Sequence, residues 1–144
     1  CFTVKGSRYL THMKRLLDRE RGLQRFYDSI APLTASPKLG PVLWQLAPTK
    51  TFDADEIRGF FALLPTHRDG IALRHAIEVR HPSFAQARFI RLLRRHRIAL
   101  VVADSAGRFP YAEDVTADFV YCRLHGGPVP TGPHHGRTDE GARP

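Results

Sequence analysis

The 144-residue chain has little cysteine, little lysine and no long apolar segment. Its two cysteines, Cys1 and Cys122, are too few for a disulfide framework, and neither lies in a Cys-x-x-Cys pair or in a zinc-type cluster with histidine. No stretch approaches the ~20 apolar residues that a membrane-spanning helix needs. The first residues also lack the basic, apolar and small-residue order of a signal peptide. We therefore expect a soluble, cytoplasmic protein that does not contact a membrane.

Motifs that identify several common enzyme classes are missing as well. The sequence contains no phosphate-binding P-loop, no Gly-x-Gly-x-x-Gly fingerprint, no Gly-x-Ser-x-Gly elbow and no His-Glu-x-x-His zinc motif. The sequence therefore predicts no cofactor.

The composition is that of a folded domain with a basic surface. Hydrophobic residues make up 42% and charged residues 25%, and the length is usual for one domain, so we expect a single packed core. The formal net charge is +8, and arginine supplies 18 of the 22 basic residues. These arginines are scattered along the chain and form no single stripe, so charge alone supports nucleic-acid binding only weakly.

Apolar spacing predicts strands that alternate with helices. Helices are indicated where apolar residues recur three and four apart, and strands where short apolar runs lie between turn residues. Asp53, with Glu56 at the third helical position, is predicted to cap one helix, and Ser83 to cap the next. The expected strands are 1–5, 42–46, 72–79, 98–103 and 118–124, and the expected helices are 20–33, 54–64 and 83–96.

This order is typical of a parallel sheet covered by helices, and two folds fit it. A five-stranded doubly wound sheet suits the length, whereas a (β/α)₈ barrel normally needs about 250 residues. Residues 105–117, with Pro110 among them, lack helical periodicity, so the last crossover is expected to be a loop. Residues 127–144 are rich in Gly and Pro and are expected to form a disordered tail.

Four groups of residues stand out along the chain. They are Thr11-His12 with Arg15-Leu16, then Leu39-Gly40-Pro41-Val42-Leu43-Trp44-Gln45-Leu46, then Glu78-Val79-Arg80-His81-Pro82-Ser83-Phe84, and last Thr116-Ala117-Asp118-Phe119-Val120-Tyr121-Cys122-Arg123-Leu124-His125-Gly126. In this order and spacing they resemble the YecE-like family, a domain of unknown function numbered 72. The similarity extends from Phe2 to Gly126.

The resemblance implies an α/β fold, a partial TIM-type (β/α) barrel with about five parallel strands and covering helices over residues 1–126. The Gly-Thr-Ser-Gly-Trp opening strand of the family and its final strands are missing here, so we expect an internal piece of a barrel, truncated at both ends. Phe84 stands where the family usually has Trp, and Ala47 where Pro is common. The family name itself records no established activity.

Side chains alternate across a strand, so residues two apart share a face. We expect the final polar residue of each strand to face the barrel axis at the C-terminal rim, where the active sites of barrels lie. Trp44 has the opposite parity to Gln45 and is expected to pack between sheet and helices, and His75 is expected to be structural or solvated. The sets that share a face are Thr3 and Lys5; Leu43 and Gln45; Ala76, Glu78 and Arg80; Leu100, Val102 and Asp104; Tyr121, Arg123 and His125.

The candidate catalytic residues are Glu78, Asp104 and His125, because carboxylates and imidazoles can transfer protons. Buried charges need partners whether or not a ligand binds, so structural ion pairs remain an alternative for the charged residues of the rim. The candidate substrate-binding residues, whose polar groups suit a phosphate or carboxylate, are Lys5, His12, Gln45, Arg80, His81 and Arg123.

Together these residues predict acid–base or hydrolytic chemistry on a small anionic substrate. Two alternatives stay open. One is a non-catalytic module that grips nucleic acid or phosphate through arginines such as Arg91 and Arg95. The other is a metal-dependent phosphoesterase with carboxylate and imidazole ligands on separate strands, although no metal ligand is assigned. The sequence does not define the oligomeric state.

Overall fold

The computed structural model describes residues 2–12, 16–34 and 38–125. The predicted tail, 127–144, lies outside these residues. Within them, no helix is long and apolar enough to cross a membrane.

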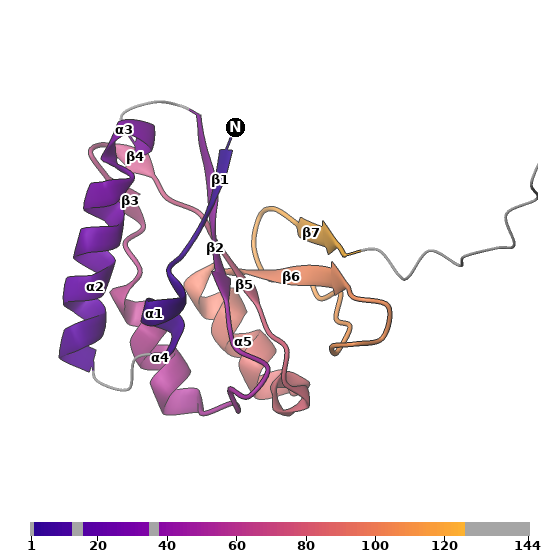
Figure 1. Ribbon diagram of the computed structural model, residues 1–144. Coiled ribbons are helices and arrows are strands. Elements are labelled where there is room, and N and C mark those ends of the chain that lie inside the picture. Colours follow the sequence, from indigo (N-terminus) through magenta and orange to yellow (C-terminus); the bar gives the residue numbers. More distant parts are fainter. Residues whose placement is uncertain (1, 13–15, 35–37, 126–144) are drawn as a thin grey trace, which may run out of the picture.

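Five parallel strands form the main sheet, in the order β1-β2-β5-β6-β7 (Figure 1). Each strand is hydrogen-bonded to the next in chain order, as in a (β/α) barrel, and the sheet curls as part of such a barrel. The expected α/β partial barrel is therefore confirmed, and the open doubly wound alternative is wrong. The strands are β1 (Phe2–Lys5), β2 (Leu39–Gln45), β5 (His75–Glu78), β6 (Ala99–Asp104) and β7 (Tyr121–Leu124).

A short antiparallel hairpin, β3 (His67–Arg68) and β4 (Ile71–Ala72), occupies the beginning of the predicted strand 72–79. Its turn is Asp69-Gly70, and both residues have positive φ, 50° and 77°. Asp-Gly is a preferred pair for a two-residue hairpin turn because both positions need the left-handed region. The hairpin was not predicted from the sequence, although Asp69-Gly70 was a signal for it. Because the hairpin takes up residues 67–72, the third strand of the sheet begins three residues later than expected.

Helices cover one side of the sheet (Figure 1). The predicted helix 20–33 starts earlier and is divided in two, and Asp53 caps α4 as expected, since its carboxylate accepts hydrogen bonds from the N–H groups of Asp55 and Glu56. Ser83 caps no helix, because His81 caps a separate 3₁₀ turn before α5. The helices are α1 (Arg8–His12), α2 (Leu16–Ser29), α3 (Ala31–Thr34), α4 (Ala54–Leu63), the 3₁₀ turn η1 (Pro82–Phe84) and α5 (Ala87–His96).

Trp44 lies at the centre of the core between the sheet and these helices, as predicted. Its ring is fully buried and contacts the rings of Phe26 from α2 and Phe60 from α4. Its indole N–H donates to Nδ1 of His75 at 3.2 Å, and Nε2 of His75 donates to the carbonyl of Pro65 at 2.8 Å. This network satisfies the polar atoms of two buried rings and confirms that His75 is structural.

The opposite face of the sheet carries a second, smaller cluster of mostly small side chains. It contains Leu43, Ala76, Ala99, Val101 and Ala103, with Phe119 and Tyr121 packed against it. This is the face that would line the inside of a barrel.

The predicted set Leu100, Val102 and Asp104 therefore faces the wrong way. Leu100 packs in the core between the sheet and the helices. The residues of β6 that belong to the inner cluster are Ala99, Val101 and Ala103. A strand buried on both faces is apolar at every position, so alternation gives no signal about which parity points inward.

Gly6 sets the distance between the end of β1 and Trp44. Its N–H donates to the carbonyl of Leu43 at 2.8 Å, and a Cβ at this position would overlap the six-membered ring of Trp44. Glycine is needed here for close approach of backbone and ring.

We predict that Gly6→Ala lowers the free energy of unfolding by about 2–3 kcal/mol, since overpacking a rigid core costs that much. In a Trp44→Phe background the same change should cost clearly less, because the overlapping ring is gone. Urea denaturation of the four proteins in this double-mutant cycle measures the coupling. Equal costs in the two backgrounds would contradict the overlap.

Burial lowers the pKa of His75 below its ordinary value of 6.5, although the hydrogen bond to Pro65 acts in the opposite direction. The unfolded chain therefore takes up a proton first as the pH falls. The stability due to neutral His75 is complete above the unfolded pKa and is lost as the pH decreases towards the folded one. We predict that His75→Asn removes a component of the stability loss between about pH 7.5 and about pH 5. Urea midpoints measured across this range, with His67→Asn as an exposed control, test it.

Candidate functional site

Glu78 ends β5, and its carboxylate is almost completely buried, with 1% of its side chain exposed. One oxygen, Oε1, accepts a hydrogen bond from Nε of Arg80 at 2.8 Å. The other, Oε2, accepts from Nη1 of Arg123. His125 places Nε2 at 3.8 Å from Oε1. The structure thus brings together four of the predicted residues, and this group is named the rim cluster.

The strand register explains why these side chains meet. Gln45 on β2 pairs with Glu78, and Arg123 on β7 pairs with Ala103 on β6, all at the C-terminal ends of the strands. Arg123 has the parity of Tyr121, which faces the inner cluster, so its guanidinium reaches across β6 to the carboxylate. Gln45 Oε1 lies 3.5 Å from the same guanidinium.

A polar cavity of about 190 Å³ lies beside the rim cluster. Arg80 and His125 line it together with Ser105, Arg108 and Phe109. The guanidinium of Arg80 stacks over the ring of Phe109 at 4.6 Å, a cation–π contact. Ser105, Arg108 and Phe109 were not predicted as site residues from the sequence. Their position directly after β6 was the available signal, because the loops that follow strands build barrel sites.

Asp104 does not join the rim cluster, contrary to expectation. Its parity directs it away from the inner face, and its Oδ1 accepts the N–H of Ala106 at 3.0 Å. This bond helps to form a tight turn in which Ala106 and Gly107 have positive φ, 52° and 77°. Asp104 therefore shapes the loop that carries Arg108, and it does not face Glu78.

The remaining predicted residues lie apart from the carboxylate. Lys5 is exposed on β1 and pairs with Leu43, two positions before Gln45. His81 sits in the cap of η1, where Nδ1 accepts the N–H of Ser83 at 3.2 Å and lies 2.8 Å from its hydroxyl. The backbone of His12 ends α1, but its side chain lies outside the described part of the chain.

The charged groups of the site are mostly positive. Two guanidinium groups, from Arg80 and Arg123, bind a single buried carboxylate, and a third, from Arg108, lies in the wall of the adjoining cavity. Such a site attracts anions and can hold them through charge-assisted hydrogen bonds. Among the described residues, no three His, Cys, Asp or Glu side chains lie together in a way that could hold a metal ion.

We predict that Glu78→Gln lowers the free energy of unfolding by about 3 kcal/mol, because removing one member of a buried ion pair leaves its partners uncompensated. The matched control is Asp28→Asn, which breaks the more exposed ion pair with Arg68 and should cost less than about 1 kcal/mol. Chemical denaturation of both variants gives the comparison. Similar losses of stability in the two variants would contradict a stabilising role of the buried Glu78 ion pairs.

Fold and site together define the class of protein: an α/β protein whose parallel sheet is part of a (β/α) barrel and whose strand ends carry a carboxylate held between two arginines. Residues 1–143 match the family described as protein of unknown function DUF72. The chain belongs to this family, which confirms the membership indicated by the sequence.

Solved structures of family members are similar to this chain. A DUF72 family protein from Thermotoga maritima MSB8 has a TM-score of 0.73 and 28% sequence identity, over 87% of this chain and 48% of that one. A DUF72 family protein from Enterococcus faecalis V583 has a TM-score of 0.57 and 25% identity, over 83% of this chain and 45% of that one. The chain thus spans about half the length of these relatives. No curated protein matches it.

Proposed function

We propose that the rim cluster and its cavity bind a small molecule carrying a phosphate or carboxylate group and perform acid–base or hydrolytic chemistry on it. The observation that carries the proposal is the 190 Å³ cavity with two arginines in its wall beside a buried carboxylate. Arg80 and Arg108 supply the positive charge for the ligand, and the hydroxyl of Ser105 offers a further polar contact.

His125 is the proton-transfer group in this proposal. Its imidazole lines the cavity and lies 3.8 Å from Glu78 Oε1, so it can exchange a proton with a ligand bound in the cavity. Glu78 acts as a positioning residue, because both of its oxygens already accept hydrogen bonds from arginine. Arg123 and Gln45 hold that arrangement from the neighbouring strands.

Binding of inorganic phosphate to the 144-residue chain, measured by isothermal titration, tests the first part. We predict that Arg108→Gln weakens binding by roughly tenfold or more, because one charge-assisted contact is lost. Arg91→Gln is the matched control, since Arg91 is an exposed arginine on α5 and does not line the cavity. Equal affinity in the two variants would contradict the proposed anion site.

Hydrolysis of 4-nitrophenyl phosphate tests the second part. The variant His125→Gln should retain phosphate binding within about threefold and lose turnover, since glutamine can donate a hydrogen bond but cannot transfer a proton at neutral pH. Unchanged turnover in this variant would exclude His125 as the proton-transfer group.

Nucleic-acid binding is a second candidate, favoured by the exposed arginines of α5. Arg88, Arg91 and Arg95 are all exposed and lie three and four positions apart on this outer helix. Retention on heparin that falls steeply with salt, and that is lost in an Arg91→Gln, Arg95→Gln double variant, would support this candidate. The same double variant leaves the rim intact, so the two functions are separable.

A further inference from the structure

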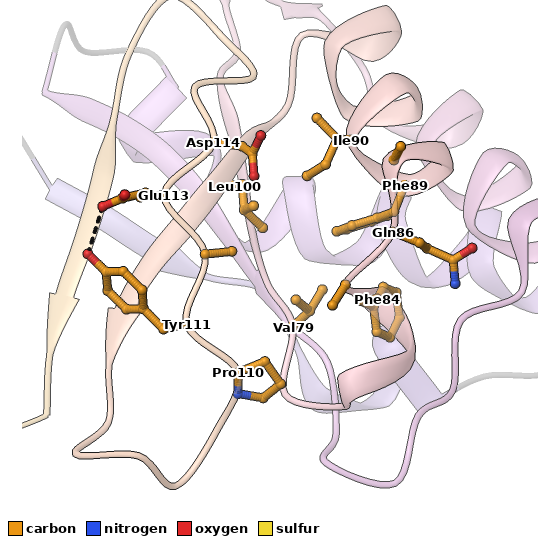
Figure 2. Close-up of a pocket in the computed structure, with 13 residues that line it drawn as sticks. Val79, Phe84, Gln86, Phe89, Ile90, Leu100, Pro110, Tyr111, Glu113 and Asp114 are labelled. Atoms are coloured by element: carbon orange, nitrogen blue, oxygen red, sulfur yellow. Dashed lines mark hydrogen bonds between the residues drawn. The ribbon is translucent and has the colours of Figure 1, made fainter.

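A second and larger cavity, of about 540 Å³, opens on the outer side of the sheet, between α5 and the loop that follows β6 (Figure 2). Its size is within the range of small-molecule sites. The walls are mostly apolar. Phe84 and Phe89 pack edge to face there, with their ring centroids 4.9 Å apart. Val79, Ile90, Leu100, Pro110 and Ala112 complete the apolar surface.

The cavity follows from the form of the last crossover. A strand of a (β/α) barrel is normally followed by a helix that covers the outer face of the sheet. Here, residues 105–120 cross from β6 to β7 without a helix, and the loop covers the sheet less completely than a helix would. The space between this loop and α5 therefore stays open.

The charged groups at the cavity are acidic. Figure 2 shows Asp114 directed from the loop towards α5 and the apolar floor, whereas Tyr111 and Glu113 lie on the other side of the loop and are joined to each other by a hydrogen bond of 3.2 Å. Within the part of the chain that the structure describes, no Lys or Arg lines the cavity. Asp114 has an ion pair with Arg94 at 3.7 Å, longer than a hydrogen bond, between side chains that are 45% and 57% exposed.

We propose that this cavity binds a small molecule with a hydrocarbon or aromatic body and one cationic nitrogen. The body replaces water on the apolar floor, and the ammonium group takes the place of Arg94 as the close partner of Asp114. The proposal is independent of the function proposed for the rim, because the two cavities share no residue.

The test uses 2-phenylethylammonium with the 144-residue chain, followed by shifts of backbone amide resonances. Saturable shifts centred on Ala87, Ile90 and Ala112 are expected. Asp114→Asn should weaken binding by roughly tenfold or more, since it removes the carboxylate partner. Glu113→Gln is the matched control and should change affinity by less than about threefold, because Glu113 is exposed, lies on the other side of the loop and is hydrogen-bonded to Tyr111.

Two further comparisons make the result decisive. Ala87→Trp fills the mouth of the cavity from an exposed position on α5 and should abolish binding without disturbing the core. The neutral analogue 2-phenylethanol should bind at least about tenfold more weakly than the amine. Absence of saturable shifts, equal affinity for the alcohol, or an Asp114→Asn variant that binds as well as the parent chain would overturn the proposal.

Discussion

The organisation of the rim depends on one constraint: the carboxylate of Glu78 is removed from water and must have its charge matched by the protein. A buried ionised carboxylate without partners would cost far more free energy than a small domain can tolerate. Arg80 and Arg123 neutralise this charge, one from the segment directly after β5 and one from β7, two strands away in the sheet. The two arginines carry more charge than Glu78, so the constraint that stabilises the site also leaves it with an excess of positive charge.

Much of the fold could be predicted from the sequence because its signals are local. Short apolar runs between turn residues indicated the strands, and Asp53, with Glu56 at the third helical position, indicated the start of α4. The parity of β6 could not be predicted, because both of its faces are buried and both are apolar. Packing against the neighbouring strands determines which face of β6 points inward. This packing is a property of the assembled sheet, and the sequence of one strand does not contain it.

In the candidate site, too, some residues could be predicted from local sequence signals and others could not. Glu78 and Arg123 end strands whose registers follow from the order of the sheet, so parity was enough to bring them together. The contribution of Arg108 depends on a turn in which Ala106, a residue with a Cβ, adopts positive φ. Few non-glycine residues do so, and periodicity carries no information about it. Side-chain alternation therefore identified the strand residues of the site, whereas its loop residues could be indicated only by their position after β6.

The helix-free crossover has a consequence for β7. The outer face of this strand is bare, with 83% of Leu124 exposed, and among the described strands only β6 is hydrogen-bonded to it. Its ladder with β6, the packing of Tyr121 against the inner cluster and the bond from Arg123 to Glu78 hold it in place. Segments with few buried contacts open locally at low free-energy cost, well below that of global unfolding. Opening of β7 would withdraw one guanidinium from the carboxylate, so the electrostatic balance of the rim is linked to the attachment of an edge strand of the sheet.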